Sequence, residues 1–193
     1  MQDNILSHDG EVFYLNDFFE FDESNFLYKK LLSEIEWKQE PIYIYGKMVM
    51  QPRLTAWYGD PGKDILYSGI SMQPHPWNSV LLYIKERVEK NQQLKFSSAL
   101  LNLYRDGNDS LGWHRDNEKE LGNNPTIASV SFGASRTFFL RNCRNKNEKH
   151  AIELKHGSLL IMKKETQYFW EHSIPKRKKI SESRVNITFR VMK

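Results

Sequence analysis

The stretch RVNITFR, residues 184–190, decides how the fold is interpreted. Side chains alternate along a β-strand, so this stretch would place Arg184, Asn186, Thr188 and Arg190 on one face and apolar residues on the other. The apolar face requires burial, which puts the strand in the core of a sheet. Two arginines that project from such a strand are costly unless an anion meets them. The stretch therefore predicts a core strand beside an anion-binding site.

The sequence around this stretch predicts a mainly β core. From residue 96 onward, short runs rich in branched and aromatic residues are separated by Gly, Asn and Asp, as is typical of strands and turns. The runs cover residues 97–104, 126–132, 136–141, 151–154, 157–162 and 184–192. The polar residues 142–150 are expected to form a hairpin loop between two strands. We predict a mainly β fold with flanking helices (α+β), whose core is a double-stranded β-helix, or jelly roll.

Two helices, at about residues 23–36 and 76–89, are expected to brace this core. In the first, leucine and isoleucine recur every four residues behind a cap at Asp22 or Ser24. In the second, Pro76 stands in the first turn and apolar residues share one face. Both helices are predicted to pack one face against the sheet.

Length and composition favour one domain, residues 1–193, with a single core. Within it we expect an N-terminal extension with a helix (1–41), a middle segment with the second helix (42–95) and the β core (96–193). The sequence contains no long apolar run and no leader pattern, so we expect an intracellular protein without a membrane span, cytoplasmic in a prokaryote or nuclear in a eukaryote. We also expect a monomer.

Composition also limits the chemistry. A single cysteine, Cys143, excludes an internal disulfide and an all-thiolate metal site, so any metal must use His and carboxylate ligands. The formal charge of +4, the pI near 9.0 and the 13% aromatic content suit a protein that meets nucleic acid by charge and stacking.

Two histidines and one aspartate form a candidate metal site. His114 and Asp116 stand two residues apart in LGWHRDNE, so both point to the same side of an extended backbone. His172, in FWEHSIP, can lie on a neighbouring strand of a β-helix. Two imidazoles and one carboxylate with open positions match oxygen-activating Fe(II). Catalytic zinc also uses three protein ligands, so the ligands alone leave the metal open.

The two arginines of the strand favour a dicarboxylate as a second ligand. Arg184 and Arg190 are six residues apart, or about 20 Å at the rise of a strand, which is too far for both to bind one carboxylate. A metal-chelated dicarboxylic acid could meet one arginine at its far carboxylate while the other helps to neutralise the metal-bound end. Asn102 and Tyr104 share one face of a strand and could hydrogen-bond the same acid. The alternative is the solvated face of an edge strand.

Several ordered blocks of the sequence resemble one family. They are PRLTAWYGD, YSGI, NLYRDGNDSLGWHRDNEKELG, IASVSFGASRTFFLR, HGSLLIMKKETQYFWEHSIPKR and RVNITFR. Over about residues 42–192 they resemble the AlkB family of Fe(II)- and 2-oxoglutarate-dependent nucleic-acid dealkylases, most closely the eukaryotic-type homologues that act on duplex DNA. The resemblance implies the iron ligands His114, Asp116 and His172. It also implies 2-oxoglutarate contacts from Asn102, Tyr104, Arg184, Asn186, Thr188 and Arg190, the last of these also in a catalytic role.

The resemblance implies a DNA repair dioxygenase that uses Fe(II), 2-oxoglutarate and O2. The reaction would be the oxidative demethylation of bases of the 1-methyladenine and 3-methylcytosine type, with release of formaldehyde, succinate and CO2. A methyl group on the pairing edge is hidden in a duplex, so the base must be flipped out. An RNA demethylase and a non-catalytic nucleic-acid-binding protein on the same fold are the alternatives. The intact metal set and both arginines oppose the second alternative.

Residues 42–95 would then hold a nucleotide-recognition lid. In similar proteins the flipped base stacks between an aromatic residue and the first iron-ligand histidine, which here would be Tyr67 and His114. Asn117 and Glu118 follow the metal motif and could contact the base edge, with Glu118 favoured by its position in the family pattern.

A predicted hairpin in IYIYGKMVMQPR carries the remaining substrate contacts. Duplex-acting relatives have an aromatic-Gly-Lys tip that wedges into the base stack, which implies this role for Tyr45, Gly46 and Lys47. An ordinary exposed hairpin is the alternative. Arg53 is expected to contact a phosphate or the orphan base. The basic run 176–179 would bind phosphate near the catalytic mouth, although it also resembles a nuclear localisation signal.

Overall fold

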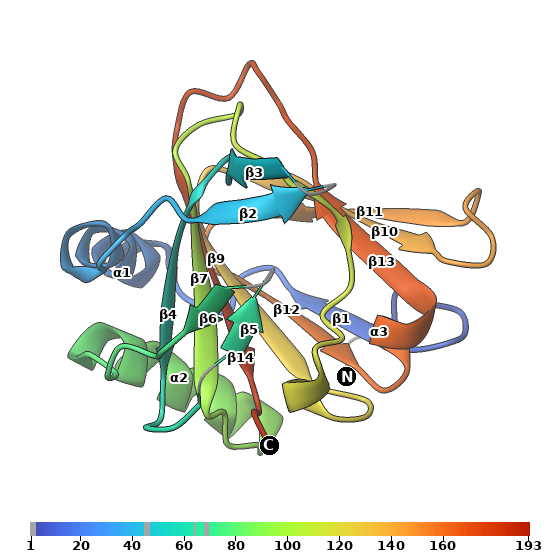
Figure 1. Ribbon diagram of the computed structural model, residues 1–193, viewed down its shortest axis with the longest axis horizontal. Helices are drawn as coiled ribbons and strands as arrows, with labels where there is room; N and C mark the ends of the chain where they lie inside the picture. The colour runs from blue at the N-terminus through green and yellow to red at the C-terminus, as the bar shows by residue number, and fades with distance from the viewer. Residues whose placement is uncertain (1–2, 45–46, 64, 68–69) are drawn as a thin grey trace.

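A computed structural model describes residues 3–44, 47–63, 65–67 and 70–193 of the protein. The protein consists of two facing antiparallel sheets, with two long helices on the outer side of the larger sheet (Figure 1). The larger sheet has the order β1-β12-β9-β14-β7-β4. Its strands are β1 (Glu11–Leu15), β4 (Leu54–Gly59), β7 (Ser98–Tyr104), β9 (Ile127–Gly133), β12 (Ser158–Lys163) and β14 (Arg184–Arg190). The smaller sheet has the order β11-β10-β13-β8. Its strands are β8 (Leu111–His114), β10 (Arg136–Asn142), β11 (Lys149–Leu154) and β13 (Trp170–Ile174).

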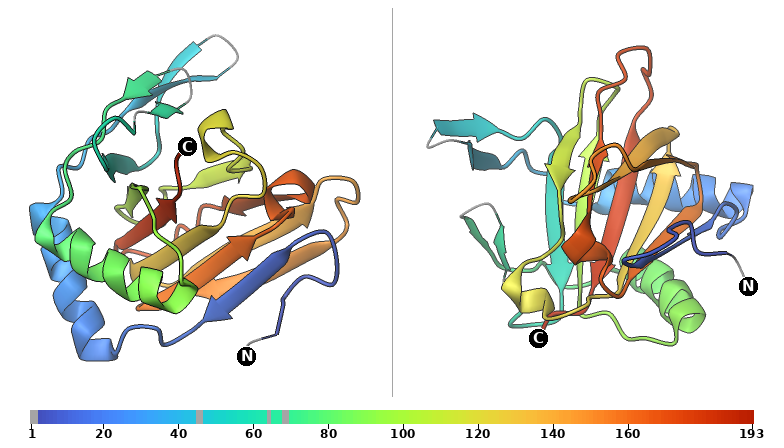
Figure 2. Two further views of the ribbon diagram at one scale, coloured as in Figure 1. Left: turned by 90° about the horizontal axis from the view of Figure 1, so that it is seen from below. Right: turned by 90° about the vertical axis from the view of Figure 1, so that its right-hand side faces the viewer.

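The remaining elements surround this sandwich. The helices are α1 (Phe21–Glu34), α2 (Ser79–Gln92), the short α3 (Thr166–Phe169) and the 3-10 turn η1 (Lys119–Leu121). Two small hairpins, β2 (Pro41–Ile44) with β3 (Lys47–Met50) and β5 (Ile65–Tyr67) with β6 (Ile70–Met72), project together from one side of the sandwich (Figure 2). None of the helices in the described ranges is both long and apolar enough to cross a membrane.

The strand β14 confirms the alternation expected from its sequence. It is a central strand, with β7 on one side and β9 on the other. Val185, Ile187 and Phe189 pack with α1 and α2 in the core on the outer side of the larger sheet. Its polar residues face the space between the two sheets. Because the apolar face of β14 is buried under the helices, its polar residues must point into the space between the sheets.

The six predicted β runs all contain strands, so the mainly β core is confirmed. The hairpin loop expected at 142–150 also connects β10 and β11, although the strands extend into that range and leave 143–148 as the loop. The sequence patterns do not predict β1, which pairs with β12 at the edge of the larger sheet and places Val12 in the core between the sheets. Four of the five β1 side chains are only partly buried, so the strand has a weak apolar signature.

Both helices exist, but the predicted starts are wrong. The first begins at Phe21, with Glu20 at the cap position and no side-chain cap; Ser24 is buried inside the helix and its hydroxyl donates to the Phe19 carbonyl at 3.3 Å. The second begins at Ser79 instead of at Pro76, and the Asn78 side chain caps it.

A contact with the neighbouring strand explains the late start of α2. The backbone N–H of His75 donates to the Trp57 carbonyl on β4 at 2.8 Å, and the Trp77 indole N–H donates to the Asp60 carboxylate at 2.8 Å. These bonds hold the chain extended alongside β4 until Asn78, so tertiary contacts override the local helix signal of Pro76.

We expect Glu89→Gln to destabilise the protein by about 2 kcal/mol at pH 7. The Glu89 carboxylate, buried at the end of α2, accepts hydrogen bonds from the Lys85 and Lys95 ammonium groups at 2.9 and 2.7 Å and from the Phe96 backbone N–H at 2.8 Å. Burial acts to raise the pKa of Glu89, but these three donors outweigh it and lower the pKa below 4.5. A lowered pKa in the folded state means that ionised Glu89 contributes stability above pH 4.5, and that this contribution is lost as the pH falls through the folded pKa.

Urea unfolding of wild type and Glu89→Gln between pH 3 and 7 measures this contribution. The difference between the two proteins should be largest near neutral pH and should narrow below pH 4.5. The exposed Glu86→Gln on the same helix is the matched control and should change stability little. A difference that stays constant with pH would contradict the charged role of Glu89.

Candidate metal and dicarboxylate site

A cavity lies between the two sheets and collects the polar face of β14. Nine of the residues expected from the sequence line it: Asn102, Tyr104, His114, Asp116, His172, Arg184, Asn186, Thr188 and Arg190. Apolar residues complete the wall, among them Leu100, Phe138 and Ile174. The cavity thus combines a cluster of possible metal ligands with cationic and amide groups inside an apolar shell.

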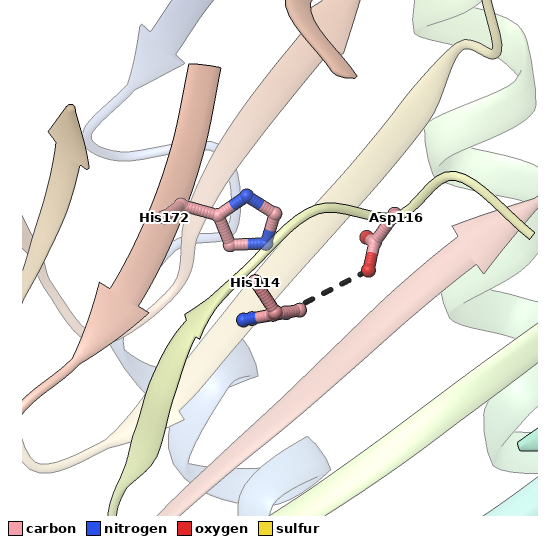
Figure 3. Close-up of side chains that lie close together, drawn as sticks. All are labelled: His114, Asp116 and His172. Carbon is pink, nitrogen blue, oxygen red and sulfur yellow. Dashed lines mark ion pairs between the residues drawn. The ribbon is translucent and has the colours of Figure 1, made fainter. Parts of the chain in front are cut away.

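The three predicted metal ligands meet at one end of this cavity. One ligand atom from each of His114, Asp116 and His172 lies within 4.8 Å of the others (Figure 3). His172 on β13 stands directly opposite His114, the last residue of β8. Asp116 follows two residues later, beyond the strand. The sequence therefore predicted the grouping correctly, and the pairing of two strands together with the loop after β8 produces it.

A hydrogen bond orients the ring of His114, and burial favours the neutral form of His172. The Nδ1 atom of His114 lies 2.9 Å from the Gly112 carbonyl, to which it donates in the neutral ring, so Nε2 is left with its lone pair near Asp116. Burial, with smaller contributions from His114 and Arg190, lowers the pKa of His172 to about 3, although Asp116 opposes this shift. Neutral imidazole is the form that coordinates metals.

Asp116 is ionised at neutral pH. Burial acts to raise its pKa, but the charge of Arg190 and the two nearby histidines outweigh it and lower the pKa of Asp116 to about 2. The Arg190 guanidinium lies 2.9 Å from a carboxylate oxygen. Two neutral imidazoles and one carboxylate on one side of a cavity are the donor set that suits Fe(II) with open coordination positions. The residues present therefore fit an iron ion.

Arg184 marks the other end of β14 and is suited to an anion. Its side chain is 1% exposed, and Nη2 donates to the Ser131 hydroxyl at 2.9 Å. The Nε and Nη1 atoms are buried without a hydrogen-bond partner among the described residues. Burial lowers the pKa of Arg184 to about 10, with Tyr104 opposing the shift, so the guanidinium stays charged at neutral pH. A buried cation with unsatisfied donors requires an anionic partner, and a carboxylate fits its planar geometry.

Polar side chains connect the two ends. Asn186 donates to the Ser129 hydroxyl at 2.7 Å and accepts a bond from Thr188 at 3.2 Å. The Asn102 oxygen accepts a bond from Arg53 at 2.6 Å. Arg53 is only 2% exposed, and its expected contact with a phosphate or the orphan base stays a prediction.

Arg136 lies next to the dicarboxylate end and was not among the residues expected from the sequence. The Tyr104 ring has the Arg184 guanidinium 5.2 Å and the Arg136 guanidinium 5.4 Å from its centre. Arg136 is 1% exposed and donates to the carbonyls of Asp109 and Pro175 at 2.8 and 2.7 Å. The sequence did contain an indication of its burial. Arg136 stands two residues before the buried Phe138 on β10, so the alternation of side chains puts both on the same face of the strand.

The structure describes only part of the predicted set of base contacts. Asn117 is exposed, whereas Glu118 is half-buried and its Oε2 atom has no hydrogen-bond partner in the described part of the chain. Lys47 is exposed at the start of β3, and the basic run 176–179 is exposed throughout. Tyr45 and Gly46 lie outside the described residues, as does the side chain of Tyr67 in β5. The expectations for all of these base and phosphate contacts stay predictions.

Comparison with known proteins identifies the family. The model of the 2OG-Fe(II) oxygenase superfamily matches residues 11–190. The chain belongs to this superfamily. Members of the superfamily use Fe(II) and 2-oxoglutarate, and the cavity offers a possible set of metal ligands at one end and the buried Arg184 at the other.

The curated relatives place the chain in the AlkB family, as the sequence motifs indicated. It is 42% identical over 184 residues to human "Alpha-ketoglutarate-dependent dioxygenase alkB homolog 3", with 91% of this chain and 64% of the relative covered. It is 39% identical over 178 residues to mouse "DNA oxidative demethylase ALKBH2", with 87% of this chain and 74% of the relative covered. The chain therefore spans about two thirds of the length of these relatives.

A solved structure supports the fold independently. The structure of OsALKBH1 superimposes with a TM-score of 0.64 at 20% identity and covers 93% of this chain and 97% of that chain. At this level of identity the likeness concerns the fold alone. It confirms the two-sheet core that the β runs predicted.

Proposed function

We propose that the protein is an Fe(II)- and 2-oxoglutarate-dependent dioxygenase that removes alkyl groups from DNA bases of the 1-methyladenine and 3-methylcytosine type. The observation that carries this proposal is the pairing, in one buried cavity, of the His114, Asp116 and His172 cluster with the unsatisfied cation of Arg184. The relative named as a DNA oxidative demethylase supports the choice of substrate.

The residues of the cavity would divide the work between its two ends. His114, Asp116 and His172 would hold the iron, and Arg190 would fix the Asp116 carboxylate that it contacts. Arg184 would bind the far carboxylate of 2-oxoglutarate beside Tyr104. Iron with 2-oxoglutarate and O2 supplies the oxidation that hydroxylates the N-alkyl carbon, with succinate and CO2 as coproducts. The hydroxylated base then loses formaldehyde and returns to its normal form.

The mouth of the site would receive a flipped base. We place Tyr67 and His114 on its two faces, as in the similar proteins. The unpartnered Glu118 carboxylate oxygen supports a contact with an exocyclic amino group, because such a buried acceptor requires a donor. Asn117 would contact the exposed side of the same base.

Access to duplex DNA would depend on the β2–β3 hairpin. Its tip residues Tyr45, Gly46 and Lys47 would enter the gap that the flipped base leaves. The apolar side chains of Met48, Val49 and Met50, all exposed on β3, support the role of this hairpin as a contact surface.

The basic run 176–179 would contact phosphates near the mouth, since all four of its side chains are exposed. We propose that the protein works as a monomer on double- or single-stranded DNA, in the cytoplasm of a prokaryote or the nucleus of a eukaryote. RNA is the alternative substrate.

An assay with matched methylated oligonucleotides tests the proposal. The protein is incubated with Fe(II), 2-oxoglutarate and single-stranded DNA, duplex DNA or RNA that carries one methylated base, and methyl loss is followed by mass spectrometry. We expect demethylation of DNA that requires both cofactors and is lost in His114→Ala. Demethylation of RNA alone would replace DNA by RNA as the substrate. No demethylation of any oligonucleotide, with His114→Ala indistinguishable from wild type, would overturn the enzymatic function.

A further inference from the structure

We propose that Gln167 is a positioning residue of the metal site: its side chain fixes the backbone of Asp116 relative to the strand that carries His172. The inference rests on the metal centre of the proposed function. In this proposal Gln167 touches neither the metal nor the substrate; it holds the ligand Asp116 in place.

Asp116 lies where the sheet no longer supports the chain. The strand β8 ends at His114, which is paired with His172, and the register of this pairing shifts between His172 and Ile174. Asp116 is therefore outside the ladder, and its backbone N–H requires another acceptor. The Gln167 side-chain oxygen accepts this N–H at 2.9 Å, in a bond between residues that are 1% and 3% exposed.

The position of Gln167 connects this bond to the second ligand. Gln167 belongs to α3, which runs directly into β13, and it precedes His172 by five residues. The segment that carries His172 thus also holds the Asp116 backbone. Asp116 is fixed from two directions, by Gln167 at the backbone nitrogen and by Arg190 at the carboxylate.

The contacts of the Gln167 side-chain nitrogen indicate that packing alone does not require a glutamine at this position. Within the described residues, the Gln167 nitrogen has only the Met162 sulfur as a hydrogen-bond partner, at 3.4 Å. A thioether is a weak acceptor, and a methionine side chain would fill the same space. The strong bond that distinguishes glutamine here from an apolar residue is the one to Asp116.

Loss of this bond should affect metal affinity more than fold. A buried N–H without an acceptor is unfavourable, and the loop after β8 can avoid this by moving toward water. Such a movement displaces the Asp116 carboxylate from the two imidazoles. Substitutions of groups that orient metal ligands typically reduce metal affinity by about 10- to 100-fold.

Two substitutions separate this role from general packing. Gln167→Met keeps the length of the side chain and removes the acceptor, whereas Gln167→Glu keeps an oxygen at the accepting position. Gln51→Met is the matched control, because Gln51 is equally buried but belongs to the segment between β3 and β4 and is not part of the cavity wall. The probe is Co(II) alone, titrated into the full chain without oxygen or nucleic acid and followed by its visible absorption.

We expect Gln167→Met to weaken Co(II) binding by about 10-fold or more, and Gln167→Glu and Gln51→Met to bind it like wild type. Folded Gln167→Met with wild-type affinity would overturn the proposal, as would an equal loss in all three variants. Hydrogen exchange of the wild-type Asp116 amide gives a test that no variant can obscure: we expect a protected amide, and fast exchange would overturn the proposal. Because the titration contains no nucleic acid, its outcome is independent of whether the protein demethylates DNA.

Discussion

Asp116→Ala should lose both metal binding and 2-oxoglutarate turnover, with metal affinity reduced by more than about 100-fold. The substitution removes the single anionic ligand of the His114, Asp116 and His172 set. It also leaves Arg190, which lies 2.9 Å from that carboxylate, as a positive charge facing the site. Groups that only orient metal ligands already contribute 10- to 100-fold, so removal of a charged ligand should exceed this range. Calorimetric titration with Mn(II), together with succinate release under Fe(II), measures both losses.

The matched control is Asp109→Ala. Asp109 is also a buried aspartate paired with an arginine, since it accepts bonds from Arg105 at 2.8 and 2.9 Å, but it is not part of the cavity wall. We expect this variant to lose stability and to keep its affinity for Mn(II). Retention of metal binding by Asp116→Ala, or an equal loss by Asp109→Ala, would be incompatible with the assignment of the ligands.

Arg184→Met should weaken 2-oxoglutarate binding by roughly 30- to 4,000-fold while metal affinity changes little. The estimate corresponds to the 2–5 kcal/mol that truncation of one partner of a buried charged pair costs. Arg184 has two buried nitrogen atoms without a partner among the described residues, so a carboxylate that meets them gains strong, desolvated hydrogen bonds. Methionine retains much of the volume and removes the charge.

Binding of 2-oxoglutarate to the Mn(II)-loaded variant measures this effect by calorimetry. Arg141→Met is the control: Arg141 lies on β10 and pairs with Glu171 at 2.6 Å outside the cavity. It should bind 2-oxoglutarate like wild type. A loss confined to metal binding, or equal losses in the two variants, would show that Arg184 does not bind the far carboxylate.

The sequence predicts much of the fold because side-chain alternation in strands is a local property. The β14 stretch illustrates this, since burial of Val185, Ile187 and Phe189 determines the direction of its polar residues. The start of α2 could not be predicted in the same way. It depends on bonds from residues before the helix to β4 and to Asp60, which become visible only when the chain is folded.

The same distinction applies to the site. The metal ligands and the arginines have distinctive spacings, and the structure brings them to one cavity. Gln167 and Arg136 were missed because their roles rest on contacts with residues far away in sequence, such as the bond from Asp116 to Gln167 across 51 positions. Both lie inside blocks that resemble the AlkB family, but no spacing within those blocks indicates what their side chains contact. Functional residues that act by holding others are therefore the part of the site that requires a structure.

Anomalous diffraction from crystals grown without oxygen in the presence of Fe(II) and 2-oxoglutarate would locate both the metal and the co-substrate. We expect one iron peak bonded to His114, Asp116 and His172, with the far carboxylate of 2-oxoglutarate on Arg184. An iron peak elsewhere, or 2-oxoglutarate bound away from Arg184, would contradict this assignment of the site.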